Sequence, residues 1–421
     1  MNISEILSIT IVLAAVFAYI NHRIIKWPPT IGIMVLSLGT SVLLAGLGKF
    51  HPFLFDKAIQ LASSINFRDV LMNFMLSFLL FAGAIQIDAH ELRKERWPVL
   101  ILSTIGILIS TTLVGGVTFY LFQLFHLPIP LIYCLLFGAL ISPTDPIAVL
   151  AILKEAKIPA SLELKISGES LFNDGVAVVV FITLLDATRW GASAIDVVNV
   201  GKLFLQQAVG GLFFGALLGY IGYYALRSID DYKVEVLVTL AIVAGGYFIA
   251  GHLNVSGPLA MVVAGIITGN KVKDEVLSKI SRDYLGKFWE LIDEMLNAIL
   301  FLLIGLEMLV IKINLTVMFI GVISIAVCLL ARWVSVFFPI LLLRFKIKFE
   351  KHAVAILTWG GLRGGLSVAL ALSLSPEMHR DDFVLITYII VVFSILVQGL
   401  TIGTVTRRLL KATDARPIDS I

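Results

Sequence analysis

The chain has 421 residues, of which 59% are hydrophobic and only 14% charged, and its mean hydropathy is +0.98. This composition leaves too little polar surface to cover a soluble globule of that size, so it predicts a protein whose solvent is lipid. The formal net charge of +3 does not indicate a nucleic-acid-binding surface. Cys134 and Cys328 fall in apolar stretches and indicate neither a disulfide framework nor a cysteine metal site.

Apolar segments able to cross a bilayer recur along the whole chain. A hydrocarbon core about 30 Å thick needs roughly 20 mostly apolar residues per helix. The predicted spans are 6–20, 30–47, 70–87, 97–125, 129–153, 166–187, 203–226, 236–250, 255–268, 296–311, 315–343, 353–374 and 384–405. The sequence therefore predicts an all-α polytopic membrane protein with about 13 transmembrane helices and no soluble domain. The first span has no basic residues before it and no cleavage site, so it is interpreted as a retained helix.

Lysine and arginine alternate between the two sides of these spans. With the N-terminus outside, 23 of the 32 basic residues lie in cytoplasmic segments and seven lie on the other side. The remaining two, Arg332 and Arg363, lie inside spans. Because cytoplasmic loops accumulate basic residues, we expect an inner or plasma membrane protein with its N-terminus outside and its C-terminus in the cytoplasm.

Segment 274–294 differs from its neighbours, because apolar residues recur at helical spacing with charges between them. This pattern predicts an amphipathic helix along the cytoplasmic interface. It either joins two halves of the protein mechanically or serves as a simple linker.

A first candidate site lies in ISPTDPIAVL, within the fifth span. Pro143 and Pro146 each remove a backbone donor, so we expect the helix to be broken or unwound around Thr144 and Asp145. Unwinding exposes backbone carbonyls and the Thr144 hydroxyl as hard oxygen ligands, as in the ion sites of transporters. Asp145 either contacts an ion directly or balances the positive ends of half-helices.

A second candidate site begins the sixth span, in GESLFNDGVAVVVF. At about 100° per residue, Ser170, Asn173 and Asp174 share one stripe of a helix, whereas Glu169 lies roughly 140° around from Asp174. The two carboxylates are therefore expected to have separate roles. Asp174 is the candidate titrating group, because a partly desolvated carboxylate can hold either a proton or a cation. A structural carboxylate, hydrogen-bonded within the bundle, is the alternative for Asp174.

Glu169 needs a counter-charge, and Arg332 and Arg363 are both available. Arg363 lies in TWGGLRGGLSVAL, where four glycines predict a second helix interruption or a close helix approach. If spans 1–6 and 8–13 are inverted repeats with span 7 between them, the two interruptions fall in corresponding fifth helices. Matching interruptions of this kind indicate a site near the bilayer midplane.

These residues carry a resemblance to a known family. Stretch 138–181 and the TWGGLRGGLSVAL segment resemble the sodium/proton exchanger branch of the monovalent cation:proton antiporter superfamily. The resemblance implies exchange of Na⁺, or Li⁺, for H⁺ without a cofactor. It also implies a homodimer in which a mobile core with two crossed, unwound helices moves like an elevator against a dimerisation domain.

Carried onto this chain, the resemblance implies that Asp174 binds cation and proton, with Ser170, Asp145 and Thr144 around the Na⁺. Asn173 stands where the electrogenic branch has a second aspartate, which implies electroneutral exchange. Glu169 would pair with Arg332, leaving Arg363 to compensate half-helix carbonyls in the second broken helix. The implied parts are dimerisation domain 1–90, core 97–190, linker helix and dimerisation domain 199–312, core 313–406 and a short cytoplasmic tail 407–421.

Three other functions fit parts of the pattern. A K⁺/H⁺ or broad monovalent cation exchanger would keep the fold and change the ion. A membrane-embedded hydrolase could use Asp145 and Asp174 as a dyad, although neither a paired histidine nor a metal-ligand motif accompanies them. A passive channel fits less well, because a single titratable site with buried ion pairs suits alternating access better than a water-filled pore.

Overall fold

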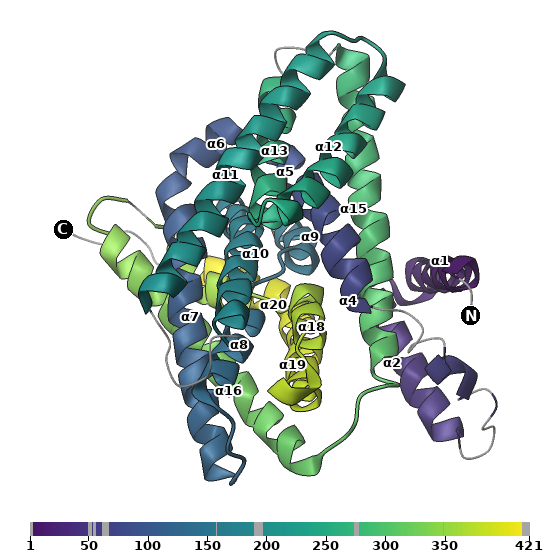
Figure 1. Ribbon diagram of the computed structural model, residues 1–421, viewed down its shortest axis with the longest axis vertical. Coiled ribbons are helices and arrows are strands. Elements are labelled where there is room, and N and C mark those ends of the chain that lie inside the picture. Colours follow the sequence, from purple (N-terminus) through teal and green to yellow (C-terminus); the bar gives the residue numbers. More distant parts are fainter. Residues whose placement is uncertain are drawn as a thin grey trace.

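The structure is a computed structural model that describes residues 3–48, 53, 56–60, 67–156, 158–188, 197–272, 278–347 and 349–414. Within these residues the elements are helices, which cross one another in a bundle (Figure 1). The long helices are α1 (Ile3–Ile20), α2 (Pro29–Leu47), α7 (Arg96–Leu124), α10 (Ala160–Thr188), α11 (Val197–Arg227), α12 (Tyr232–His252), α15 (Lys279–Glu307) and α16 (Leu315–Leu343). Shorter ones are α4 (Phe67–Val70), α5 (Leu76–Gln86), α6 (Ala89–Lys94), α8 (Leu131–Ile141), α9 (Ile147–Glu155), α13 (Gly257–Ile267), α17 (Ala353–Trp359), α18 (Gly365–Leu372), α19 (Arg380–Phe393) and α20 (Leu400–Asp414).

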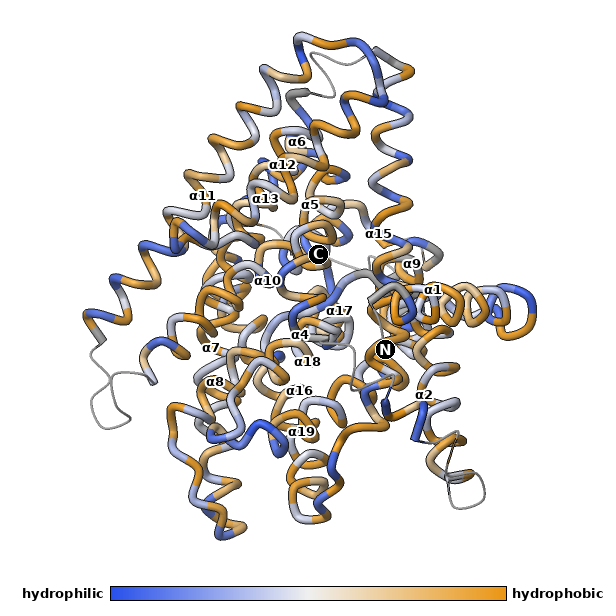
Figure 2. Tube along the Cα trace, turned by 45° about the vertical axis from the view of Figure 1, so that its right-hand side comes forward, coloured by the Kyte–Doolittle hydropathy of each residue, from blue (hydrophilic) through white to orange (hydrophobic). Residues whose placement is uncertain are grey.

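Each of the thirteen predicted spans is helical over most of its length. Eight helices of the described residues are long and apolar enough to cross a membrane, and shorter apolar helices lie among them. Figure 2 shows hydrophobic residues along most of the helices, whereas strongly hydrophilic stretches occur mainly near helix ends and connections. The predicted class, an all-α polytopic membrane protein, is confirmed.

Short polar side chains fix where several helices begin. The Asp231 carboxylate accepts a hydrogen bond from the backbone N–H of Lys233 at the start of α12. Ser278 and Asn314 cap α15 and α16 in the same way. Each cap satisfies a backbone donor that has no partner inside its helix, so these starts are encoded locally.

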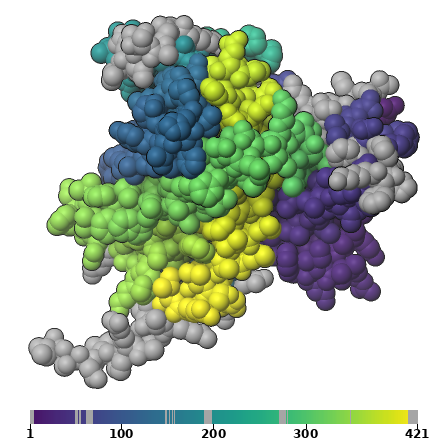
Figure 3. Space-filling model, turned by 90° about the horizontal axis from the view of Figure 1, so that it is seen from below, coloured from purple at the N-terminus to yellow at the C-terminus, as the bar shows by residue number. Residues whose placement is uncertain are grey.

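Two groups of helices pack mainly within themselves. In one group, α7 packs against α8, α10 and α16, and α16 also packs against α19. In the other, α13 packs against α5, α11 and α12, and α15 packs against α2 and α5. The π-helical turn η5 (Ser394–Gly399) contacts α2, so the first and last parts of the chain meet, as the purple and yellow surfaces show in Figure 3.

Both predicted interruptions are present, and they cross each other. The fifth span is split into α8 and α9, and the twelfth into α17 and α18. At the crossing the backbone N–H of Asp145 donates to the carbonyl of Leu362 over 2.8 Å, as an isolated antiparallel bridge. The chain therefore replaces lost helical hydrogen bonds with bonds between the two broken segments, as buried backbone requires.

One expectation at a helix boundary needs correction. Within the predicted interfacial segment, residues 274–277 lie outside the described part of the chain, and Lys279 begins a single helix that runs without a break to Glu307. The expected interfacial helix and tenth span are thus one element, because no proline or glycine interrupts 287–304. Residues 407–414 of the expected tail 407–421 are helical, as the end of α20, and residues 415–421 lie outside the described part of the chain.

Candidate functional site

Arg363 compensates the end of the first half-helix. Its guanidinium Nη1 donates to the carbonyl oxygens of Ser142 and Pro143, the latter over 3.0 Å. These carbonyls follow the last residue of α8, where no helical partner remains for them. A buried cation at the negative end of a helix stabilises that end. Arg363 was expected to compensate carbonyls of the second broken helix, and in the structure it contacts carbonyls of the first.

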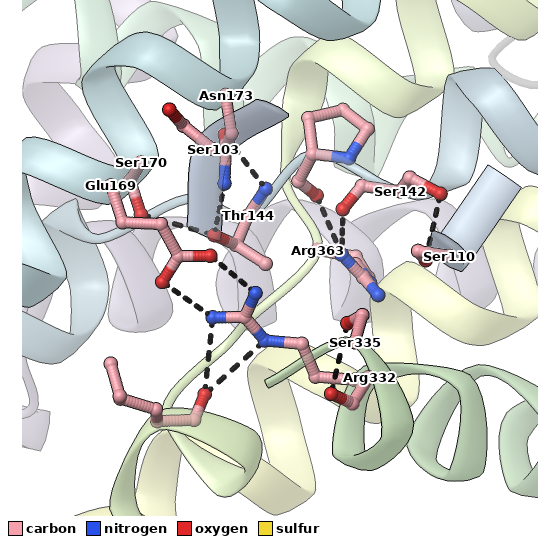
Figure 4. A network of polar contacts seen from close by, with 12 residues as sticks. Ser103, Ser110, Ser142, Thr144, Glu169, Ser170, Asn173, Arg332, Ser335 and Arg363 are labelled. Atoms are coloured by element: carbon pink, nitrogen blue, oxygen red, sulfur yellow. Dashed lines mark hydrogen bonds and ion pairs between the residues drawn. The ribbon is translucent and has the colours of Figure 1, made fainter. Parts of the chain in front are cut away.

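Glu169 and Arg332 form a buried ion pair. Both guanidinium Nη atoms donate to the Glu169 carboxylate, Nη2 over 2.8 Å to Oε2, and Glu169 is only 1% exposed. Arg332 also donates to the carbonyl of Leu357, in α17, through Nε at 3.3 Å and Nη2 at 3.2 Å. Figure 4 shows the Arg332 guanidinium facing the Glu169 carboxylate. Arg332 therefore ties α10 to the first half of the second interrupted helix.

The unwound segment is held by α10 through Thr144. The Thr144 hydroxyl lies 3.0 Å from the Ser170 hydroxyl and accepts a hydrogen bond of 2.8 Å from the Asn173 amide nitrogen. The backbone N–H of Thr144 faces the Asn173 amide oxygen at 3.4 Å (Figure 4). Both ends of the Asn173 amide are thus used to position the broken helix.

A cavity of about 1270 Å³ reaches this site. It is lined by Thr144, Asp145 and Asp174, and also by exposed residues such as Glu91 and Lys154, so it connects the crossing with the protein surface. Asp145 and Asp174 are both only partly buried. The carboxylates of Asp145 and Asp174 therefore line a common space that water and ions can occupy.

Ser170 and Asn173 do not line this cavity among the described residues. Both side chains are buried and both bond to Thr144. Of the predicted Na⁺ ligands, the structure brings Asp174, Asp145 and Thr144 to the cavity, and it places Ser170 and Asn173 one layer behind. The single helix stripe predicted for Ser170, Asn173 and Asp174 was too coarse to distinguish these layers.

The second interruption is supported by η5, which the sequence did not single out. The Ser394 hydroxyl accepts a 2.9 Å hydrogen bond from the Arg363 backbone N–H and donates to the Gln398 side-chain oxygen at 2.8 Å. The Gln398 amide nitrogen donates to the Trp359 carbonyl over 3.0 Å. These bonds satisfy backbone groups that the break between α17 and α18 leaves unpaired. The only signal for them is that Ser394 and Gln398 are polar residues within an apolar span.

Glycines at the crossing permit its close approach. A methyl group added to Gly364 would lie 2.7 Å from Cβ of Asp145, and one added to Gly361 would lie 2.6 Å from Nε of Arg332. Such separations are shorter than real side-chain contacts. The glycines that the sequence associated with a helix break therefore also make room for the side chains of the site.

Sequence reasoning also missed the cavity wall formed by α15, where Asp293 and Asn297 lie. Their spacing at i and i+4 was visible, but nothing in the sequence relates this helix to the crossing. In the described part of the chain, no group of three or more histidine, cysteine, aspartate or glutamate side chains is arranged to hold a metal ion.

Two crossed, interrupted helices, with buried charge compensation and carboxylates facing a common cavity, define the class as an ion-handling polytopic membrane protein. Residues 11–408 match the family described as "Sodium/hydrogen exchanger, transmembrane", and the chain belongs to this family. The resemblance predicted from the two motifs is confirmed. Because the family is one of exchangers, the hydrolase alternative is excluded.

Named relatives agree with this assignment. The chain is 47% identical over 410 residues to the Na(+)/H(+) antiporter NhaP of Pseudomonas aeruginosa, with 96% of each chain covered. It is 33% identical over 394 residues to the Na(+)/H(+) antiporter NhaH of Halobacillus dabanensis, covering 92% of this chain and 93% of that one. The solved structure of the sodium proton antiporter MjNhaP1 from Methanocaldococcus jannaschii at pH 8 superposes with a TM-score of 0.74 over 96% of this chain and 97% of that chain. At 19% identity, that likeness shows the fold.

Proposed function

We propose that this protein exchanges Na⁺ for H⁺ across the membrane, with Asp174 binding either the cation or the proton. The observation that carries the proposal is the contrast between the two carboxylates of α10. Glu169 is fully engaged by Arg332, whereas Asp174 faces the cavity together with Asp145. A carboxylate in a partly desolvated site accepts a proton readily, and a cation in the same place favours its ionised form. Competition between the two ligands for one group couples their movements.

The ligand set of the proposal consists of hard oxygens. Asp174, Asp145 and Thr144 line the cavity, and the unwound backbone around Thr144 adds carbonyl oxygens. Ser170 and Asn173 hold Thr144 in place for this role. No cofactor enters the cycle, because the transported ions are the only reactants.

Exchange of one Na⁺ for one H⁺ is the stoichiometry that we propose. Asn173 stands beside Asp174, and its amide is committed to Thr144. With Asp174 as the single titrating carrier, one proton leaves for each cation that binds, so no net charge moves. Asp145 then acts as a fixed charge near the ion.

Alternating access is proposed to occur by movement of one helix group against the other. The group of α7, α8, α10, α16 and α19, together with the other interrupted-helix segments α9, α17 and α18 that pack on it, contains the crossing and would form the mobile core. The group of α2, α5, α11, α12, α13 and α15 would form the dimerisation domain of a homodimer. In the proposed orientation, the protein lies in the cell membrane and the cavity opens toward the cytoplasm. Lys94 and Lys154 line the cavity, and the basic residues around them lie in segments assigned to the cytoplasmic side.

A proteoliposome assay tests this function. Purified protein is reconstituted with an imposed pH gradient, and proton movement is followed with an internal dye after addition of Na⁺, Li⁺ or K⁺, at zero and at non-zero membrane potential. We expect Na⁺-dependent proton movement that is independent of the potential. Proton movement in response to K⁺ alone would identify K⁺, not Na⁺, as the exchanged ion. Dependence on the membrane potential would reject the one-for-one stoichiometry.

The variant Asp174→Asn assigns the carrier. It should abolish Na⁺-dependent proton movement, because an amide cannot release a proton when the cation binds. Asp186→Asn is the matched control, since Asp186 lies twelve residues further along the same helix and does not line the cavity. Exchange retained by Asp174→Asn would remove Asp174 from its assigned role.

A further inference from the structure

The cavity that reaches Asp174 has a second acidic wall, on α15. Four residues at positions i, i+3, i+4 and i+7 share one face of this helix and line the cavity: Glu290, Asp293, Glu294 and Asn297. Glu290 and Glu294 are exposed, Asp293 is partly buried and Asn297 is only 2% exposed. The polar wall therefore continues from the surface into the protein, on a helix other than those that carry Asp174 and Asp145.

Asn297 ends this wall with an unpaired oxygen. Its amide nitrogen donates to the backbone carbonyl of Asp293 over 2.8 Å and to the Asp293 carboxylate over 3.1 Å. Both of these partners are acceptors, so the nitrogen must face them and the amide oxygen must face away. That oxygen is buried and has no hydrogen-bond partner among the described residues. A buried acceptor without a partner is costly, which indicates a ligand that the protein atoms do not provide.

A second unpaired oxygen lies at the same cavity, on α18. Ser367 lines the cavity, is 1% exposed, and its hydroxyl has no partner among the described residues. The helices α15 and α18 are neighbours, and a methyl group added to Gly365 would lie 2.5 Å from the Leu300 side chain. Two orphaned oxygens thus occur on adjacent helices, next to an acidic wall.

Asp293 lines the same cavity as Asp145 and Asp174 of the main site. We infer that the Asn297 amide oxygen and the Ser367 hydroxyl form a second contact site for an alkali cation, with the Asp293 carboxylate supplying negative charge from the acidic wall. This site receives the ion from the cavity and passes it to Asp174. The inference rests on the proposed Na⁺/H⁺ exchange. Carboxylate, amide and hydroxyl oxygens are hard ligands of the kind that alkali and alkaline-earth cations take.

This second site is expected to bind weakly and to exchange its ion quickly. It carries one carboxylate, and the described residues contain no group of three or more acidic, histidine or cysteine side chains that could enclose a metal. A site with few charged ligands holds a cation loosely, which suits an intermediate stop. Its contribution should therefore appear in the Na⁺ concentration dependence of exchange and not in the maximal rate.

The first test measures exchange kinetics in proteoliposomes. For Asp293→Asn we expect the KM for Na⁺ to rise at least about fivefold, the loss that corresponds to about 1 kcal/mol, with the rate at saturating Na⁺ retained. Asp283→Asn is the matched control, since it removes one charge from the same helix at an exposed position outside the cavity. An unchanged KM for Asp293→Asn, or a complete loss of exchange at saturating Na⁺, would overturn the relay.

The second test measures binding without transport. Ligand binding to the folded state raises the melting temperature by mass action, so purified Asp174→Asn protein is melted in NaCl and in choline chloride at equal ionic strength. We expect a residual stabilisation by Na⁺ in Asp174→Asn, and its loss in the double variant Asp174→Asn/Asp293→Asn. Equal melting in both salts for Asp174→Asn would overturn the second site and assign the orphaned oxygens to water. If the wild-type protein shows no Na⁺-dependent proton movement, the proposed function is overturned. The melting experiment measures Na⁺ binding without transport, so the two failures can be told apart.

Discussion

Two carboxylates five residues apart on α10, those of Glu169 and Asp174, have different roles because their surroundings differ. Glu169 is held in an ion pair by Arg332, which also donates a hydrogen bond to the Leu357 carbonyl, whereas Asp174 lines the cavity. Taking two charges out of water is expensive, and the cost is recovered only when the geometry is good and the remaining donors find partners. The Arg332 contacts meet this condition, so the pair can be structural while its neighbour stays available for ions.

Breaking this pair should cost stability. We expect Arg332→Ala to lower the free energy of unfolding by about 3–5 kcal/mol, because it leaves a buried carboxylate without its partner. The measurement is the melting temperature in detergent. Glu163→Gln is the matched control, since it breaks the exposed 3.3 Å contact with Lys154, and such a surface pair contributes about 0–1 kcal/mol. Equal losses in the two variants would contradict the buried role of Arg332.

At the scale of elements, the crossing of the two interrupted helices replaces regular hydrogen bonding with specific compensation. Arg363 serves carbonyls at the end of α8, Arg332 serves a carbonyl in α17, and η5 supplies Ser394 and Gln398 to the second break. Each interruption is thus stabilised by side chains from elsewhere in the chain. This arrangement keeps irregular backbone inside the protein, where it can face an ion.

The crossing should be sensitive to added volume at Gly364. A methyl group there would lie 2.7 Å from Cβ of Asp145, and overpacking of this kind costs about 1–3 kcal/mol. We expect Gly364→Ala to lower the melting temperature and to reduce Na⁺-dependent proton movement, because Asp145 must shift.

The control for this prediction is Gly245→Ala, in the middle of α12. A methyl group at Gly245 would meet nothing within 4 Å, and replacing glycine by alanine inside a helix stabilises it by about 0.5–1 kcal/mol. The two variants are therefore expected to change stability in opposite directions. Full activity in Gly364→Ala would show that the crossing tolerates a looser approach.

The helices and their interruptions could be predicted from the sequence wherever they depend on residues close together in the chain. Pro143 and Pro146 marked the first break, four glycines marked the second, and the helical rotation separated Glu169 from Asp174. Contacts between remote segments had no such signal. Nothing in the sequence relates Ser394 to the backbone of Arg363, or Asn297 on α15 to the cavity, because these neighbours arise from packing between helices.

At the scale of the whole molecule, one buried cation joins three distant segments near the mouth of the cavity. Lys165, on α10, is 1% exposed, and its amine lies 3.0 Å from the Glu350 carboxylate and 3.2 Å from that of Glu95. Glu95 precedes α7, and Glu350 lies in the connection between α16 and α17. The cluster therefore connects the first part of the proposed core to its second part.

The Glu350 carboxylate makes the stability of this cluster depend on pH. Burial alone would raise the pKa of Glu350, but hydrogen bonds from the Ser161 hydroxyl, from its own backbone N–H and from Lys165 outweigh burial and leave the pKa below its ordinary value. A carboxylate whose pKa is lower in the folded state stabilises the protein at pH values above its unfolded pKa of about 4.3. That contribution is lost as the pH falls through the lowered pKa of the folded state.

Glu350→Gln tests this linkage. At pH 7 we expect the variant to melt at a lower temperature than the wild type, by an amount that corresponds to about 1–3 kcal/mol, because Lys165 loses one of its two charged partners while remaining buried. As the pH falls below about 4.3, the wild-type carboxylate takes up a proton and the difference between the two proteins should shrink. Asp283→Asn, which removes an exposed carboxylate from the 2.7 Å pair with Lys287, should show a small difference at every pH. A difference for Glu350→Gln that stays constant from pH 7 into this acid range would mean that the Glu350 charge does not stabilise the link between the two parts of the core.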